Sequence, residues 1–173
     1  MIRCILFDRD GTLGELVDKK YPQSLVPYPR IQETFSILKE KGYKVGIITN
    51  QSSIARGTAG DYDFDKEFSD WGADIWAICP HDVHDNCDCR KPKSGLILDV
   101  CNRLGISPSE CIMIGDRITD VQCGKNAGAE GILVLTGVGY SQKEETLSLY
   151  PDAVILNRYD EMIKRLHYHL PIY

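Results

Sequence analysis

Residues 2–13 read Ile2-Arg3-Cys4-Ile5-Leu6-Phe7-Asp8-Arg9-Asp10-Gly11-Thr12-Leu13. The apolar run predicts a buried strand over residues 2–7 that ends in two carboxylates. Ligands of open α/β sheets bind at the carboxyl ends of the strands, so Asp8 and Asp10 are expected to face a substrate crevice. Gly11 permits the tight turn that brings the second carboxylate beside the first. Two such carboxylates repel each other unless a cation lies with them. Taken alone, the pair also fits a polar surface loop.

Strand and helix patterns alternate along the rest of the chain. This alternation predicts an α/β fold with a mostly parallel central sheet of five or six strands, helices on both faces and a minimal cap. We expect one domain over residues 1–173. Further strands are predicted at 45–49, 75–79, 111–115, 131–135 and 153–156. Helices are predicted from Tyr28 to near Gly42 and at 64–71, 96–104, 118–127, 142–149 and 160–170, with a helical turn at Ser107–Glu110.

Composition excludes several classes of protein. The chain has 173 residues, with 20 Lys and Arg against 25 Asp and Glu, and a formal charge of −5. An acidic balance argues against a nucleic-acid binder, which needs clustered cations. No apolar run approaches the roughly 20 residues that cross a bilayer, and the N-terminus has no signal-peptide pattern. We therefore expect a cytoplasmic protein without a membrane or nucleic-acid partner, either a monomer or a weak oligomer.

Polar residues follow other predicted strands in the same way. Thr49, Asn50 and Gln51 end the second strand, and Asp116, Arg117 and Asp120 follow the strand that ends at Gly115. Arg90 and Lys91 add positive charge just before a helix. Hard oxygen donors for Mg²⁺, a hydroxyl and a lysine at strand ends together predict a phosphoryl-transfer site.

The loop at 79–89 predicts a second metal site. Cys79, His81, Cys87 and Cys89 form the pattern C-x-H-x5-C-x-C, which suits a closed tetrahedral Cys₃His zinc site of structural type. His84 could replace His81 as the nitrogen ligand. A zinc ion here would aim the next two residues, Arg90 and Lys91, at a bound phosphate. The other four of the seven cysteines are expected to pack as small apolar residues; they are Cys4, Cys101, Cys111 and Cys123.

The ordered set Asp8-x-Asp10-Gly11-Thr12, Thr49, Lys91 and Gly115-Asp116-x-x-x-Asp120 resembles the haloacid dehalogenase (HAD) superfamily of aspartate-nucleophile phosphatases. The resemblance spans about residues 1–136 and implies a three-layer Rossmann-like core. It implies that Asp8 is the nucleophile, that Asp10 is the general acid and base, and that Thr49 and Lys91 hold the phosphoryl oxygens. Asp116 would bind Mg²⁺ together with Asp8 and the Asp10 backbone carbonyl. Asp120 and Arg117 would support the site from behind.

The zinc loop narrows the resemblance to the branch of the histidinol-phosphate and heptose bisphosphate phosphatases. The spacer before Cys87 and the run from Gly115 to Asp120 are similar to the histidinol-phosphate type, whereas residues 49–57 are similar to the heptose type. By this analogy the substrate is a small phosphorylated metabolite of carbohydrate metabolism or histidine biosynthesis. The residues expected to bind it are Asn50, Gln51, Ser52 and Arg90.

Two departures from the branch lie where specificity for the leaving group is set. Gly14-Glu15 replaces the usual Asn of the heptose type, and the segment 58–74 matches neither pattern. A nucleic-acid-end phosphatase and a non-catalytic zinc-stabilised binding module are the alternative functions.

Overall fold

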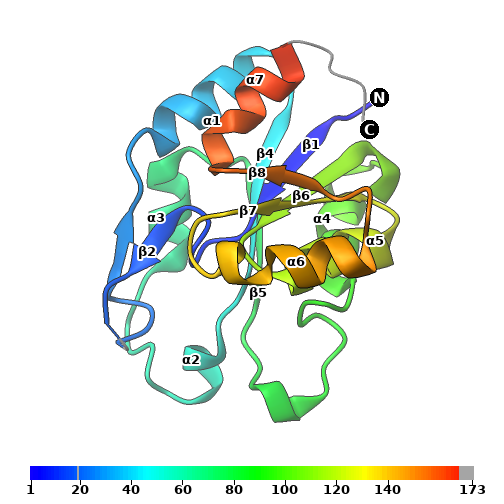
Figure 1. Ribbon diagram of the computed structural model, residues 1–173. Coiled ribbons are helices and arrows are strands. Elements are labelled where there is room, and N and C mark those ends of the chain that lie inside the picture. The colour runs from blue at the N-terminus through cyan, green and yellow to red at the C-terminus, as the bar shows by residue number, and fades with distance from the viewer. Residues whose placement is uncertain (19, 168–173) are drawn as a thin grey trace.

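The computed structural model describes residues 1–18 and 20–167. Its main sheet has six strands within these residues, all parallel, in the order β5-β4-β1-β6-β7-β8 (Figure 1). The strands are β1 Cys4–Phe7, β4 Lys44–Asn50, β5 Ile75–Cys79, β6 Cys111–Gly115, β7 Glu130–Val134 and β8 Val154–Leu156. The predicted α/β fold with a mostly parallel sheet is confirmed.

Helices cover both faces of this sheet, because each strand alternates its side chains between two apolar clusters. Ile5 and Phe7 of β1 face the cluster under α1 and α3, whereas Cys4 and Leu6 face the cluster under α4. The helices are α1 Ile31–Glu40, α2 Ser52–Ala55, α3 Phe64–Trp71, α4 Gly95–Leu104, α5 Ile118–Ala127, α6 Gly139–Leu149 and α7 Met162–His167. No helix in the described part of the chain is long and apolar enough to span a membrane.

Several boundaries differ from those predicted. The first strand begins at Cys4 rather than Ile2, and α6 begins at Gly139 rather than Gln142. A single 3₁₀ turn, Tyr159–Glu161, precedes the last helix, so α7 begins at Met162 rather than Asp160. Residues 168–170 of that predicted helix lie outside the described residues. The predicted turn at Ser107–Glu110 is present as a 3₁₀ turn with a capping box.

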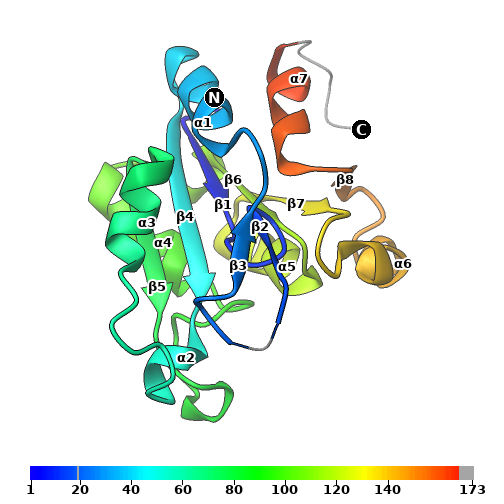
Figure 2. The ribbon, with the colours of Figure 1, turned by 90° about the vertical axis from the view of Figure 1, so that its left-hand side faces the viewer.

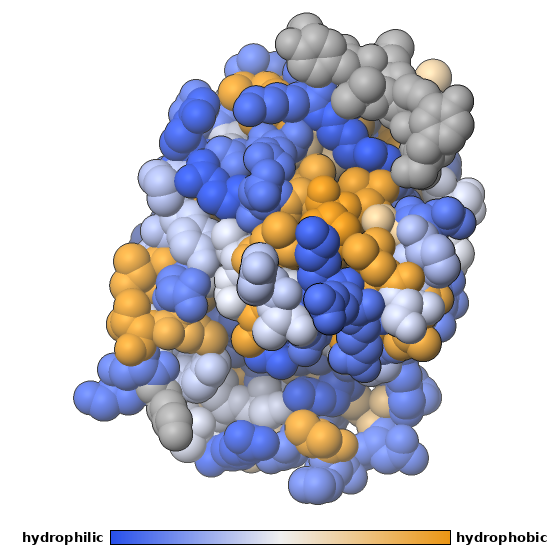
Figure 3. All heavy atoms as spheres, in the orientation of Figure 1, coloured by the Kyte–Doolittle hydropathy of each residue, from blue (hydrophilic) through white to orange (hydrophobic). Residues whose placement is uncertain are grey.

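A small hairpin that the sequence patterns did not predict forms the cap. Strands β2 Gly14–Leu16 and β3 Leu25–Pro27 pair antiparallel and stand beside the carboxyl end of β4 (Figure 2). Each strand has only three residues, too short to produce a clear alternating pattern. Exposed apolar side chains on this segment include Val17 and Val26. In Figure 3 an orange area lies at the left edge of the molecule, where Figure 1 places the hairpin.

Candidate active site

The loops that follow the parallel strands meet at one edge of the sheet, the lower edge in Figures 1 and 2, and enclose a cleft of about 1440 Å³. Residues predicted for the site line it together with residues of the β2–β3 hairpin. The predicted ones are Asp8, Asp10, Asn50, Gln51, Ser52, Arg90, Lys91, Asp116, Arg117 and Asp120, and the hairpin adds Glu15, Leu16, Lys20, Tyr21 and Gln23. Thr49 is buried and does not line the cleft.

The first motif turns sharply after β1. Gly11 has a φ of 80°, and its N–H donates to the Gly14 carbonyl at 2.8 Å. A side chain at Gly11 would collide with the Asp116 carboxylate, because a Cβ there would lie 2.2 Å from Asp116 Oδ2. The turn therefore needs glycine both for its backbone conformation and for this close approach.

Three buried carboxylates gather at the carboxyl edge. One oxygen each of Asp8, Asp116 and Asp120 lies within 4.8 Å of the others. Burial, followed by the charges of Asp8 and Asp120, raises the pKa of Asp116 to about 8. Its Oδ1 is buried without a hydrogen-bond partner among the described residues. A carboxylate with a free buried oxygen and a raised pKa is a favourable ligand for a hard cation, because the cation supplies the positive charge that stabilises the ionised carboxylate.

Lys91 joins two of these carboxylates. Its Nζ lies 2.6 Å from Asp8 Oδ1 and 2.6 Å from Asp120 Oδ1. Burial by itself lowers the pKa of Lys91, but the charges of Asp120 and Asp8 outweigh it and the net shift is upward, so the lysine is cationic. Burial raises the pKa of Asp120 to about 6 despite the adjacent ammonium. Asp120 Oδ2 also accepts a hydrogen bond from the Arg117 N–H at 3.0 Å, so both oxygens of Asp120 bond to other residues of the site.

The residues after β4 bond to other site residues. Asn50 Oδ1 accepts the Lys91 N–H at 3.1 Å, and Asn50 Nδ2 donates to the Lys91 carbonyl at 3.2 Å. Gln51 Nε2 donates to Asp10 Oδ2 at 2.8 Å and to Thr49 Oγ1 at 3.0 Å. These amides thus hold the lysine and the second aspartate in place. Contact between Asn50 or Gln51 and a substrate stays a prediction.

Arg90 and Ser52 stand together at the cleft wall. Arg90 NH1 donates to Ser52 Oγ at 2.9 Å and to the His81 carbonyl at 3.2 Å, and Ser52 Oγ donates to the same carbonyl at 3.2 Å. The loop that contains His81 therefore sets where the arginine lies.

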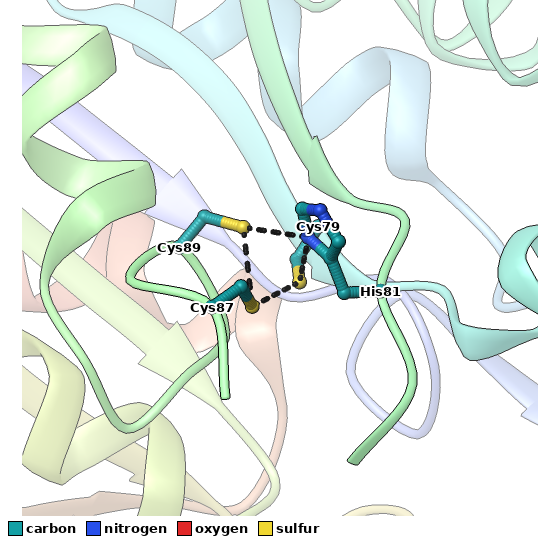
Figure 4. Close-up of side chains that lie close together, drawn as sticks. All are labelled: Cys79, His81, Cys87 and Cys89. Atoms are coloured by element: carbon teal, nitrogen blue, oxygen red, sulfur yellow. Dashed lines mark hydrogen bonds between the residues drawn. The ribbon is translucent and has the colours of Figure 1, made fainter. Parts of the chain in front are cut away.

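The predicted zinc ligands come together (Figure 4). Cys79 Sγ lies 3.7 Å from His81 Nδ1 and 3.6 Å from Cys87 Sγ, and Cys89 Sγ lies 3.5 Å from Cys87 Sγ and 3.3 Å from His81 Nδ1. Zinc bonds of about 2.3 Å to sulfur and about 2.0 Å to nitrogen put tetrahedral donors roughly 3.5–3.8 Å apart, close to these separations. Among the described residues, His81 belongs to this cluster and His84 does not.

The cluster also favours a thiolate. Burial acts to raise the pKa of Cys87, but hydrogen bonds from the Arg90 backbone N–H and the Cys89 thiol lower it to about 7. Because metals bind the thiolate, this environment suits a ligand. The other four cysteines, Cys4, Cys101, Cys111 and Cys123, are buried in the core as predicted.

Two contacts to the aspartates of the site were not predicted, one from Gly137 and its neighbour and one from Arg9. Gly137, after β7, has a φ of 54°, and a Cβ there would lie 2.2 Å from Asp116 Oδ2. The next residue, Val138, donates its N–H to the same oxygen at 2.9 Å. Arg9 is only the spacer between the aspartates in the motif, yet its NH1 lies 2.5 Å from Asp10 Oδ1. A glycine pair after a strand was the available signal for the first; no local signal marks the second.

Known proteins match most of this chain. A D-glycero-beta-D-manno-heptose-1,7-bisphosphate 7-phosphatase of Haemophilus influenzae is 34% identical over 169 residues, which cover 87% of this chain and 91% of the relative. The chain belongs to this family of HAD phosphatases. The same enzyme of Pasteurella multocida is 36% identical over 79% of this chain and 84% of its own. The HAD-hydrolase-like family model matches residues 88–161.

The fold agrees with this membership. The crystal structure of D,D-heptose 1,7-bisphosphate phosphatase from B. bronchiseptica, complexed with magnesium and phosphate, superposes with a TM-score of 0.81 at 26% identity. It covers 97% of this chain and 99% of that chain. The resemblance to HAD phosphatases is therefore confirmed, and the chain is a phosphoric monoester hydrolase. These relatives favour the heptose type and give no support to a role in histidine biosynthesis.

Proposed function

We propose that this phosphatase hydrolyses a phosphorylated heptose, D-glycero-β-D-manno-heptose 1,7-bisphosphate, at its 7-phosphate. The observation that carries the proposal is the pairing of Asp8 with Lys91 at the carboxyl edge, in a chain 34% identical to an enzyme of that name. The non-catalytic module is set aside, because the chain belongs to a family of phosphatases.

Asp8 is the proposed nucleophile. One of its carboxylate oxygens attacks phosphorus while the bond from phosphorus to the sugar oxygen breaks, which leaves an aspartyl-phosphate and a sugar alcohol. Water then attacks phosphorus, the bond to Asp8 breaks, and inorganic phosphate leaves with the carboxylate restored. The covalent intermediate divides one high barrier into two lower ones.

Asp10 is the proposed acid and base. It gives its proton to the sugar oxygen in the first step and takes a proton from the attacking water in the second. Burial raises the pKa of the Asp10 carboxyl, which helps it to hold a proton, although the charge of Arg9 opposes that shift. A proton placed within reach of a poor leaving group typically contributes about 10²- to 10⁴-fold to the rate.

The oxygen donors around Asp116 fit Mg²⁺. Asp116 Oδ1, which has no hydrogen-bond partner in the part of the chain that the structure describes, the Asp8 carboxylate and the Asp10 carbonyl are hard ligands of the kind that this ion prefers. When bound, Mg²⁺ would neutralise the charge on the phosphoryl oxygens, so that an anionic nucleophile can approach. Lys91 supplies a second positive charge. Thr49 is proposed to hold a phosphoryl oxygen, which requires Gln51 to release the buried Thr49 Oγ1 that it now contacts at 3.0 Å.

Residues 79–89 are proposed to hold a structural zinc ion. The donor set of Cys79, His81, Cys87 and Cys89 fits the ion in number, type and spacing. The four donors leave no ligand position open for a substrate, so the metal would fix the loop and take no part in the reaction. Arg90 and Lys91 follow directly, and Arg90 and Ser52 are proposed to recognise the substrate.

The experiment is a comparison of phosphate release from heptose 1,7-bisphosphate, histidinol phosphate and a 3′-phosphorylated oligonucleotide in the presence of Mg²⁺. The heptose is expected to give the highest kcat/KM. Asp8→Asn should abolish release from every ester, whereas Asp99→Asn, an exposed aspartate on α4, should leave it unchanged. A preference for histidinol phosphate or the oligonucleotide would overturn the substrate, and an active Asp8→Asn would overturn the nucleophile.

A further inference from the structure

Arg9 has a fully buried side chain, and it connects Asp10 to a part of the chain outside the proposed machinery. Its NH1 donates to Asp10 Oδ1 at 2.5 Å. Its Nε and NH2 donate to the two oxygens of Glu67 on α3, at 2.7 and 3.0 Å. NH2 also reaches Tyr62 Oη at 2.8 Å and the Pro22 carbonyl at 3.1 Å.

These contacts fix the plane of the guanidinium. The bidentate contact with Glu67 allows the guanidinium one orientation, because two parallel N–H groups donate to the two carboxylate oxygens. Tyr62 Oη donates to Glu67 Oε1 at 2.6 Å, which closes a ring of hydrogen bonds. The rings of Tyr62 and Phe64 lie 5.3 and 5.4 Å from the guanidinium carbon. Arg9 is therefore a rigid element, unlike an exposed arginine with many rotamers.

A rigid Arg9 holds Asp10 from one side while Gln51 holds it from the other. Oδ1 accepts from Arg9 and Oδ2 accepts from Gln51. Each oxygen keeps a second lone pair, so the carboxyl can still carry and transfer a proton. Glu67 also balances the positive charge of Arg9, which would otherwise bear on Asp10 alone.

We propose that Glu67 and Tyr62 are positioning residues for the phosphatase reaction, and that they act through Arg9 to aim the Asp10 carboxyl at the leaving sugar oxygen. This inference rests on the proposed role of Asp10 as acid and base. It also gives the segment 58–74 a function, because the chain after α2 brings two side chains against the first motif and thereby sets where the proton is delivered.

The test compares two leaving groups. A sugar alkoxide needs a proton as the bond to phosphorus breaks, whereas nitrophenolate leaves without one. Because kcat/KM reports the first irreversible step, a misaimed Asp10 should lower it for a sugar phosphate and spare it for p-nitrophenyl phosphate. We expect Glu67→Gln to reduce kcat/KM about tenfold or more for heptose 1,7-bisphosphate, or for glucose 6-phosphate if the heptose is not hydrolysed, and less than about twofold for the aryl ester.

The matched control is Glu130→Gln. Glu130 pairs with Arg165 at 2.9 Å, and its side chain is 14% exposed, against 13% for Glu67. It begins β7, at the end of the sheet opposite the cleft. This control should leave kcat/KM unchanged for both esters. If Glu67→Gln does not fold, Tyr62→Phe removes one hydroxyl from the same ring of hydrogen bonds and should shift the ratio of the two esters in the same direction.

Asp10→Asn separates this inference from the function on which it rests. The inference is supported if Asp10→Asn lowers kcat/KM for the sugar ester much more than for the aryl ester, and if Glu67→Gln or Tyr62→Phe does the same. Inhibition by inorganic phosphate should stay unaltered in these variants. If Asp10→Asn shows this selectivity, but the Glu67 and Tyr62 variants lower kcat/KM equally for both esters or for neither, the inference alone is overturned. If Asp10→Asn itself is unselective, the acid role falls and the inference falls with it.

Discussion

Replacing Gly137 with alanine should disable the site by displacing Asp116. A Cβ at this position would lie 2.2 Å from Asp116 Oδ2 and 2.7 Å from the Gly11 Cα. Ordinary contact begins at 3.4 Å, so one partner must move by about 1.2 Å. The contact with the Gly11 Cα joins two stretches of backbone, so one of the two turns must shift as well; at the closer contact the Asp116 carboxylate, as the end of a side chain, is the group that moves. That movement also breaks its bond with the Val138 N–H.

The size of the effect follows from this displacement. A misplacement of about 1 Å in a catalytic group can cost on the order of 10²-fold in rate. We therefore expect kcat/KM of Gly137→Ala to fall by roughly that factor, and its Mg²⁺ requirement to rise, because Asp116 is a proposed ligand. The φ of 54° adds strain of about 1–2 kcal/mol to the folded state, which is a separate effect.

Gly105→Ala isolates the strain. Gly105 caps the C-terminus of α4 with a φ of 64°, and a Cβ added there would meet no atom of the described residues within 4 Å, so alanine incurs the same backbone penalty without a collision. Activity at varied Mg²⁺ and the melting temperature are measured for both variants. Both variants should have a lower melting temperature than the unsubstituted protein, and Gly137→Ala alone should lose activity. A folded Gly137→Ala with unchanged Mg²⁺ dependence would refute the reasoning.

Three further predictions concern the metals and Lys91. Because the pKa of Asp116 is raised to about 8 from about 4 in the unfolded chain, the metal-free folded protein holds a proton there that the unfolded chain has lost, and its stability should fall as pH rises through that window. Mg²⁺ binds the ionised carboxylate, so its stabilising shift in melting temperature should grow between about pH 6 and about pH 8, and a shift independent of pH would contradict this. Metal analysis should find about one zinc per chain, which Cys87→Ser loses while circular dichroism still reports a folded core; zinc retained by that variant would exclude Cys87 as a ligand. Asn50→Ala frees the backbone of Lys91 and should lower kcat/KM about tenfold without changing the zinc content, whereas unchanged kinetics would show that the lysine is held by its other contacts.

The sequence predicted where the carboxylates of the site lie, because their placement at the strand ends depends on local patterns. A buried strand followed by Asp8 and Asp10, and another followed by Asp116, place carboxylates at one edge whatever the loops do, since parallel strands end on the same side. The clustering of Cys79, His81, Cys87 and Cys89 was predictable for a similar reason. These four side chains lie within eleven residues, so their spacing alone limits the geometry.

The hairpin of the cap and the contacts of Asn50 were not predictable in this way. The hairpin strands are three residues long, and a pattern of that length does not separate a strand from a turn. Asn50 is predicted to bind a substrate and lines the cleft, but its sequence position did not reveal that both ends of its amide also bond to the backbone of Lys91, 41 positions away. An amide after a strand has the same local signature in either role.

What the sequence by itself determined, then, is the succession along the chain of the strands of the main sheet and of most helices, the carboxylates at the strand ends, and the four Cys and His residues that cluster at 79–89. Only the tertiary structure decided that Arg9 pairs with Glu67, 58 positions away, and that Gly137 abuts Asp116. Local periodicity reports which face of an element is buried, but it carries no information about which buried groups meet. Those meetings depend on how separate elements pack, and at this site they set where Asp10 and Asp116 point.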